Sequence, residues 1–513
     1  MVSRRLVALV GVMVLAAGVG ASGSPSGART PAPTTGTFRA LTYNVAGLPE
    51  GLSGSNPSVN TPLISPLLND YDLVLVQEDW VDPVPPIPGF DFFHDDLISQ
   101  VDHPHLSTPA TPPNGTDPRR PTALVADGLN RLSRFPFGPI TRQMWPNCFG
   151  GANTSDGGAG DCLSQKGFSV ARTEFAPGVS VDVYNLHGEA GSTALDEQYS
   201  AEDYVTLAAF MQIYSAGRAV LVGGDFNLHT DRPFDRQVFD TFLAATDLID
   251  VCVVVDCGAD ADQIDKFVYR SGGGVDLAPI DHMFEREKFQ RDDGEPLSDH
   301  DALAVTFAWS RQAPGSVSGS LTRDGAPLAG ATVLAYTVAD TWLGSAGATT
   351  DAGGRFVLEG VVPGAYRLLF RPPAGLGLAR EWFDDATKRA AGEVVTVDPD
   401  GAVTGVEANL DDGATVAGMV TDAAGRPVEG IEVWAYDPTD AWVGTSATAT
   451  AADGSYRLEG VPEGSYRILF RAVPGSGHRS EWFDDAATRG DASVLSLQHG
   501  DVVDDVAAVL ASG

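Results

Sequence analysis

The sequence predicts an α+β protein, in which a mixed α/β domain is followed by two all-β sandwich domains. The 513 residues exceed the roughly 150 residues of a typical domain about threefold. β-type apolar runs alternate with longer segments in the N-terminal half, whereas the C-terminal part contains a repeat of short strands. Hydrophobic residues at 43% and charged residues at 20% are typical of a globular chain rather than a disordered one.

Residues 1–21 predict a secretory signal peptide, and residues 22–36 predict a linker. Arg4 and Arg5 precede the apolar stretch from Leu6 to Val19, and a Ser/Pro/Gly/Thr tract follows. The apolar stretch is short for a membrane anchor. We therefore expect export to the extracellular space.

The cysteines support that expectation. The chain has four, at Cys148, Cys162, Cys252 and Cys257. An even number of cysteines in an oxidising compartment usually pairs, and pairing between sequence neighbours is favoured among the three connectivities. Closing the Gly-rich stretch from Cys148 to Cys162 would remove roughly 3 kcal/mol of unfolded-state entropy.

Residues 37–310 predict the mixed α/β domain. The expected strands are Arg39 to Tyr43, Leu73 to Val76, Ser169 to Thr173, Val181 to Tyr184, Ala219 to Val222 and Ala304 to Phe307. A helix is expected from Leu195 to Ala216, where apolar residues recur at near-helical spacing.

Polar residues follow several of these runs, where rigid strands can hold side chains in a cleft. They are Asn44, Glu78, His187, Asp225 with Asn227, Asp281, and Asp299 with His300. Each alone is more typical of a turn or a solvated loop. Their joint occurrence indicates a site.

The residue types in this set favour metal-assisted hydrolysis of a phosphoester. Glu78 offers a carboxylate and Asn44 a neutral oxygen, and such hard ligands suit Mg²⁺. A zinc site would require more His or Cys at close spacing. His300, oriented by a carboxylate from Asp281 or Asp299, would activate water. His187 would donate to phosphoryl oxygens in the transition state.

The motifs that carry these residues are Thr42-Tyr43-Asn44-Val45, Gln77-Glu78, Asn185-Leu186-His187, Gly223-Gly224-Asp225-Phe226-Asn227, Ile280-Asp281-His282 and Ser298-Asp299-His300. In type and order they resemble the endonuclease/exonuclease/phosphatase superfamily. The resemblance implies a four-layer αββα sandwich with a Mg²⁺ site, open to Mn²⁺ or Ca²⁺, at one end of two packed sheets. His282 departs from the family, which commonly has Tyr there.

The resemblance also implies a role for each position. Glu78 would hold the metal with Asn44 beside it, His300 would be the general base, His187 and Asn227 would bind phosphate, Asp225 would position the nucleophile or stabilise charge, and Asp299 and Asp281 would support the histidines or the metal.

A second resemblance concerns the substrate. The segment from Cys162 to Phe168, with Lys166-Gly167-Phe168 at its end, is similar to secreted bacterial neutral sphingomyelinases. It implies cleavage of sphingomyelin to phosphocholine and ceramide. The alternative for this segment is a strand start after a disulfide loop. An aromatic residue, Trp80 or Trp145, would contact the choline ammonium or else pack in the core or at its rim.

Charge bears on the same choice. Asp and Glu number 68 against 33 Lys and Arg, and the net charge of −35 repels nucleic acids and anionic membranes. A secreted nuclease, the main rival, would need a basic groove, but the domain has only Lys166, Lys266 and Lys288 as lysines. Against the lipid, the stretch from Phe284 to Leu297 is short, charged and lacks the aromatic hairpin of membrane-active relatives.

Residues 315–412 and 415–511 predict two tandem β-sandwiches. We expect the chain to be a monomer. The run Glu381 to Asp385 recurs as Glu481 to Asp485, at an offset of 100 residues. The repeats resemble carboxypeptidase regulatory-like or transthyretin-like modules. Their paired tryptophans are Trp342, Trp442, Trp382 and Trp482. Core packing is favoured over a polysaccharide platform for these tryptophans, and the modules are expected to be spacers or targeting arms.

A non-catalytic adhesin is disfavoured because all catalytic residue types are present.

Overall fold

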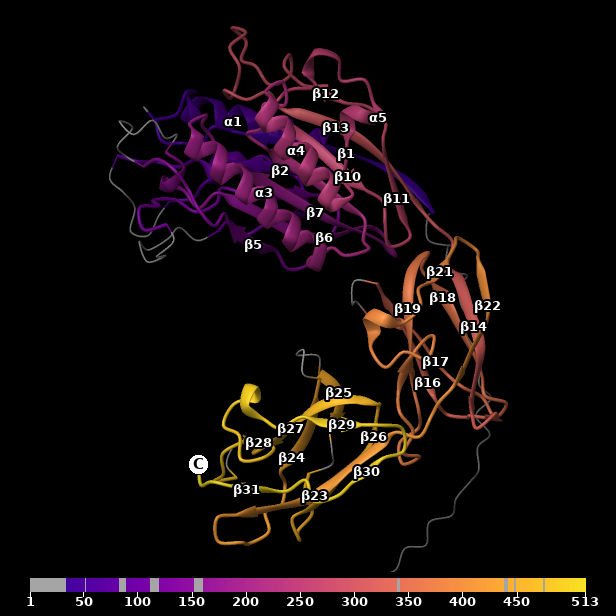
Figure 1. The fold of residues 1–513 in the computed structure, drawn as a ribbon. Helices are drawn as coiled ribbons and strands as arrows, with labels where there is room; N and C mark the ends of the chain where they lie inside the picture. Colours follow the sequence, from indigo (N-terminus) through magenta and orange to yellow (C-terminus); the bar gives the residue numbers. More distant parts are fainter. Residues whose placement is uncertain are drawn as a thin grey trace, which may run out of the picture.

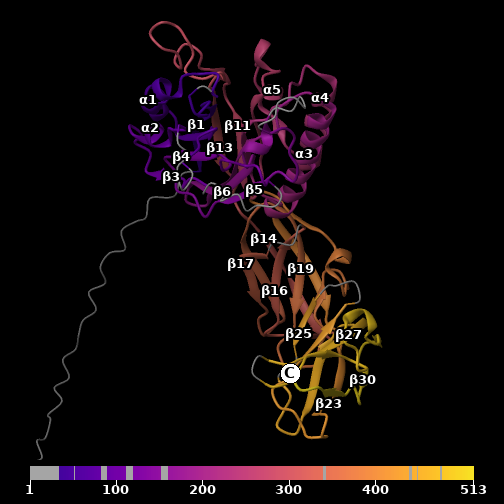
Figure 2. The same ribbon diagram turned by 90° about the vertical axis from the view of Figure 1, so that its left-hand side faces the viewer.

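The computed structural model of the chain shows an α/β unit followed by two β-sandwich modules (Figures 1 and 2). It describes residues 34–50, 52–82, 89–110, 120–151, 160–338, 342–437, 442–446, 449–473 and 476–513. The predicted signal peptide and most of the linker lie outside these residues. Among the described residues, no helix combines the length and hydropathy needed to cross a bilayer.

Two sheets form the centre of the α/β unit. The first has the order β11-β13-β1-β2-β4-β3, with β12 also paired to β13. Its strands are β1 (Thr35–Asn44), β2 (Leu73–Gln77), β3 (His105–Leu106), β4 (Asn130–Ser133), β11 (Val275–Pro279), β12 (Met283–Phe284) and β13 (Leu303–Arg311). β1 runs parallel to β2 and antiparallel to β13.

The second sheet has the order β5-β6-β7-β8-β10-β9. Its strands are β5 (Thr141–Met144), β6 (Gly167–Ala176), β7 (Val179–His187), β8 (Val220–Asp225), β9 (Ile249–Asp250) and β10 (Asp265–Arg270). β7 and β8 are parallel, and β10 runs antiparallel to β8. The six strands expected from the sequence are all confirmed.

The helices are α1 (Pro57–Leu67), α2 (His94–Ile98), α3 (Ala194–Tyr214), α4 (Pro233–Thr246) and α5 (Val251–Val254). α3 confirms the predicted helix. It begins with a capping box, in which Thr193 Oγ1 accepts from the Asp196 N–H and the Asp196 carboxylate accepts from the Thr193 N–H.

Alternation along the strands divides the apolar side chains between layers. Leu73 and Leu75 pack between the two sheets, whereas Val74 and Val76 pack toward α1. On the outer face of the second sheet, Tyr184 contacts the core under α3 and α4. Figure 2 shows α1 and α2 on one side of the strands and α3 and α4 on the other. The predicted four-layer αββα sandwich is confirmed.

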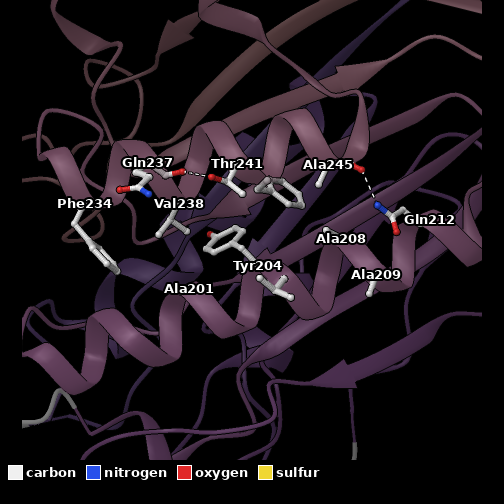
Figure 3. A pocket seen from close by; sticks show the side chains of 12 residues that line it. Ala201, Tyr204, Ala208, Ala209, Gln212, Phe234, Gln237, Val238, Thr241 and Ala245 are labelled. Atoms are coloured by element: carbon white, nitrogen blue, oxygen red, sulfur yellow. Dashed lines mark hydrogen bonds between the residues drawn. The ribbon is translucent and has the colours of Figure 1, made fainter.

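α3 and α4 pack against each other on the outside of the second sheet. Tyr204 lies between them, and Gln212 Nε2 donates to the Ala245 carbonyl at 2.9 Å (Figure 3). An apolar groove of about 400 Å³ follows this seam, with the exposed side chain of Val205 among its lining.

The first module comprises two facing sheets, β15-β14-β18 with β22, and β17-β16-β19-β20 with β21. Its strands are β14 (Gly315–Arg323), β15 (Ala326–Pro327), β16 (Thr332–Thr337), β17 (Trp342–Thr349), β18 (Arg355–Val361), β19 (Gly364–Arg371), β20 (Glu381–Trp382), β21 (Val395–Val397) and β22 (Ala402–Asn409). Trp382 is buried against Leu334 and Leu369, so it belongs to the core, as favoured from the sequence.

The second module repeats this arrangement, with sheets β26-β23-β30 plus β31 and β25-β24-β27-β28 plus β29. Its strands are β23 (Ala414–Asp422), β24 (Glu432–Tyr436), β25 (Trp442–Ser446), β26 (Ser455–Val461), β27 (Gly464–Arg471), β28 (Glu481–Trp482), β29 (Leu495–Leu497), β30 (Val502–Val503) and β31 (Ala508–Leu510). Trp482 is half-buried, with its ring centroid 5.3 Å from that of Tyr436. The side chains of Trp342 and Trp442 lie outside the description.

Both disulfides join sequence neighbours. Cys148 pairs with Cys162, and Cys252 pairs with Cys257. The predicted local connectivity is therefore confirmed.

Candidate active site

The polar ends of the central strands meet at one end of the two sheets. Asn44 closes β1 beside Gln77 of β2, and His187 closes β7 beside Asp225 of β8. Asp265 opens the antiparallel strand β10 opposite Asp225. Because β13 starts beside the end of β1, the residues just before β13 reach this end as well.

Buried polar side chains join the two sheets beneath this end. Gln77 Nε2 donates to Asn185 Oδ1 at 2.7 Å, and Asn185 Nδ2 donates to the Val76 carbonyl at 3.0 Å. These groups have no access to water, so their mutual hydrogen bonds fix the distance between the sheets. The polar side chains at the ends of these strands are therefore held at a fixed spacing.

Asn44, Glu78, His187, Asp225 and His300 form one cluster. Asn44 Nδ2 donates to Glu78 Oε1 at 3.1 Å and to Asp225 Oδ2 at 3.2 Å. The same Asp225 oxygen lies 3.3 Å from His187 Nε2 and 3.7 Å from His300 Nε2. The side chains of Glu78 and His300 are 19% and 17% exposed, against 1% for Asp225. Glu78 and His300 are thus more exposed than Asp225.

The carboxylate on His300 is that of Asp265. Its Oδ2 lies 2.8 Å from His300 Nδ1, so neither of the two expected partners fills this position. Asp281 is exposed, and its Oδ1 accepts from the Thr306 N–H at 2.7 Å. Asp299 is exposed at the rim, where its Oδ1 accepts a hydrogen bond from Ser298 Oγ.

The sequence has the same local pattern, an isoleucine and an aspartate before a strand, at Asp265 and at Asp281. Ile264-Asp265 precedes the apolar run of β10, just as Ile280-Asp281 precedes β12. The two motifs look alike, but β10 is a six-residue central strand next to β8, whereas β12 has two residues. Strand pairing, which one sequence does not reveal, decides which Asp reaches His300.

Two site residues have left-handed backbone conformations. Glu78 has φ +57° and Asn227 has φ +50°, and such values are uncommon outside glycine and concentrate at functional sites. Asn227 Nδ2 donates to the Gly188 carbonyl at 3.1 Å. A Cβ at Gly188 would lie 2.4 Å from the Phe226 carbonyl, so this close approach requires glycine.

Burial and neighbouring charges set the protonation states. Burial alone would lower the pKa of His300, but the carboxylates of Asp265 and Asp225 outweigh it and raise the pKa to about 10. Burial, assisted by the Lys166 and His300 charges, holds the pKa of His187 well below its usual range. These shifts favour a cationic His300 beside a neutral His187. Burial raises the pKa of Glu78.

Lys166 lies behind the cluster rather than on its surface. Its Nζ is 2.7 Å from Asp161 Oδ1 and donates to the Gly188 carbonyl at 3.3 Å. Trp80 and Trp145 are also buried, and Trp145 Nε1 donates to the His187 carbonyl at 2.7 Å. Of the two alternatives that the sequence left open for these tryptophans, burial favours core packing over contact with a choline group.

The modules match a known family model. The carboxypeptidase regulatory-like domain matches residues 316–408 and 415–493. This confirms the resemblance inferred for the repeats.

The chain is similar to sphingomyelinases. Curated sphingomyelinases from Mycobacterium bovis and Mycobacterium tuberculosis are 34% identical to it over 300 residues, which cover 54% of this chain and 54% of theirs. The chain thus spans about half the length of the curated relatives it matches. The resemblance inferred from the motifs is confirmed at the level of sequence.

Solved structures show weaker likeness. Sphingomyelinase C from Streptomyces griseocarneus is 16% identical, with a TM-score of 0.36 over 53% of this chain and 99% of its own length. An endonuclease/exonuclease/phosphatase from Beutenbergia cavernae is 16% identical, with a TM-score of 0.39 over 90% of this chain and 100% of its own.

Proposed function

We propose that this chain is a secreted, Mg²⁺-dependent phosphodiesterase that hydrolyses sphingomyelin to phosphocholine and ceramide. The observation that carries the proposal is the cluster itself, in which Glu78, Asp225 and the His300–Asp265 pair converge at one end of two packed sheets. The similarity to sphingomyelinases supports the choice of substrate.

The donor set fits a hard divalent cation. Asp225 and Asp265 place two carboxylates beside one imidazolium, and the Asn44 amide joins the carboxylate of Glu78 to that of Asp225. Ligand atoms of Asp225, Asp265 and His300 lie within 4.8 Å of one another. We assign Glu78 as the principal ligand, with Asn44 beside it and Asp299 at the rim. Mn²⁺ or Ca²⁺ would meet the same oxygen donors.

When bound, such a cation would polarise the phosphoryl oxygen and offset the carboxylate field that keeps His300 protonated. Neutral His300 would then accept a proton from water at Nε2, while Asp265 holds Nδ1. His187 and Asn227 would donate hydrogen bonds to phosphate oxygens, and Asp225 would orient the nucleophile or stabilise charge.

A zwitterionic phospholipid fits the charge of this chain better than a nucleic acid. The net charge of −35 repels polyanions. The lysine nearest the cluster, Lys166, is buried and paired with Asp161, so it offers no surface for a phosphate backbone. Export is supported by the two disulfides, since such bonds persist in oxidising compartments.

The test compares two substrates with the mature protein. We expect Mg²⁺-dependent phosphocholine release from sphingomyelin, suppressed by EDTA, and no nicking of duplex DNA. Glu78→Ala and His300→Ala should each lower phosphocholine release at least about a hundredfold while retaining the circular dichroism spectrum. Nicking without phosphocholine release would make the chain a secreted nuclease, and an active His300→Ala enzyme would refute the assigned base.

A further inference from the structure

A valine-rich turn protrudes near the candidate active site. Val251 is buried, but the next two valines of this turn, Val253 and Val254, are 78% and 52% exposed. The turn comprises α5 and the residues up to Cys257. Two neighbouring valines that stay in water do not contribute the free energy of apolar burial. They contribute it only when another apolar surface covers them.

Covalent and hydrogen-bond constraints hold this turn in shape. The Cys252–Cys257 disulfide closes it, and the Asp250 carboxylate accepts from the Cys252 N–H at 3.1 Å. A preformed turn loses little conformational entropy when it binds. The two valines are therefore held ready for contact in the free protein.

The turn lies at the same end of the molecule as the cluster. β9 pairs with β10 and leads directly into α5, so α5 lies beside the start of β10. Cys252, His282 and Asp265 line one small enclosed space, and Asp265 contacts His300. Figure 2 shows α5 at the end of the α/β unit farthest from the β-sandwich modules.

Charge determines which apolar surface suits the turn. No Lys or Arg occurs between Arg236 and Lys266, and seven acidic residues lie in that interval. Lys266 is buried, and Arg236 pairs with Asp262 at 3.1 Å. An anionic bilayer would be repelled by this segment, whereas a zwitterionic one would not.

We propose that the disulfide-closed turn from Val251 to Cys257 inserts Val253 and Val254 into the surface of a zwitterionic lipid bilayer. This inference rests on the proposed function, because a choline phospholipid in a membrane must bring its phosphate to the cluster beside the turn. The turn supplies an apolar contact in a chain whose stretch from Phe284 to Leu297 carries no aromatic hairpin.

The experiment measures flotation of the full chain with vesicles of phosphatidylcholine and sphingomyelin, in EDTA to prevent turnover. We expect Val253→Ser/Val254→Ser to reduce vesicle partitioning about tenfold or more, since two side chains lose their transfer from water. Val205→Ser/Ile213→Ser is the matched control. It removes two aliphatic side chains that are 65% and 81% exposed on α3, and it should bind as the parent does. Phosphatidylglycerol vesicles should bind the parent less well.

Turnover of soluble p-nitrophenylphosphorylcholine should be the same in the parent and Val253→Ser/Val254→Ser. Single Val253→Ser, at the most exposed position of the turn, provides the same test if the double variant fails to fold. Equal partitioning of the parent and the turn variants would overturn the inference, as would concentration-dependent self-association that the turn variants abolish. Vesicle binding lost in the turn variants, without phosphocholine release by the parent, would refute the proposed function and leave the lipid contact standing.

Discussion

At the scale of single residues, the pairing of His300 with Asp265 rather than Asp281 makes a sharp prediction. Asp265→Asn keeps the size of the side chain but removes the charge 2.8 Å from His300 Nδ1. We expect kcat to fall about a hundredfold or more. The acid limb of the pH–rate profile should shift to lower pH, because the Asp265 carboxylate is the first of the charges that raise the pKa of His300.

Asp281→Asn is the matched control. Its exposed carboxylate bonds the Thr306 N–H, so kcat and the pH profile should follow the parent. Steady-state turnover of sphingomyelin across pH distinguishes the two. A normal profile in Asp265→Asn, or a hundredfold loss in Asp281→Asn, would contradict the geometry.

The same pair shows what sequence alone could predict of the site. Asn44, Glu78, His187, Asp225 and His300 each stand directly at or near the end of an apolar run or in an ordered motif, and the structure brings all five together. Asp265 could not be distinguished from Asp281, because both follow isoleucine before an apolar run. The choice depends on long-range strand pairing, which local pattern does not encode.

At the scale of secondary structure elements, long apolar runs were predictable and short elements were not. β1, β2, β6, β7, β8, β13 and α3 follow their hydrophobic periodicity. α5 does not, because β-branched valines favour a strand. The Asp250 cap and the disulfide to Cys257 bend this run into a single helical turn.

α3 also carries a carboxyl group on its buried face, from which a pH dependence follows. Asp203 is 0% exposed, and neither carboxylate oxygen has a hydrogen-bond partner among the described residues. Burial, and then the charge of Glu189, raises its pKa to about 10. Between about pH 4 and pH 10 the folded state therefore holds a proton that the unfolded chain has released. The free energy of unfolding consequently falls by up to about 1.4 kcal/mol per pH unit as the pH rises through this range.

Asp203→Asn should remove this loss. We expect a higher Tm than the parent at pH 8, with the difference shrinking toward pH 5, as measured by thermal denaturation. Asp240→Asn, at an exposed position of α4, should leave the pH dependence of Tm unchanged. Equal slopes of Tm against pH in Asp203→Asn and the parent would refute the buried, protonated state.

At the scale of the whole molecule, each part has its own hydrophobic core. The clusters of the α/β unit share no residue with those of the two modules. The first module contacts the α/β unit where Val362 approaches Gly274. That contact is at the end where Thr35 pairs with Ser310, opposite the end at which Asn44 enters the cluster. The expectation that the modules act as a spacer or a targeting arm, for example toward a cell surface or polysaccharide, stays a prediction.

Ending the chain after Pro314 should consequently leave the chemistry intact. β13 and its pairing to β11 would be complete, and among the described residues no hydrogen bond or ion pair joins the cluster to the modules. We expect kcat/KM on p-nitrophenylphosphorylcholine to stay within about twofold of the full chain, because the residues proposed to bind the substrate all lie in the retained α/β unit. His300→Ala in the shortened chain sets the background. The circular dichroism spectrum and the Tm of the shortened chain show whether it folds. If it folds but its turnover collapses, the modules support the site and the prediction is wrong.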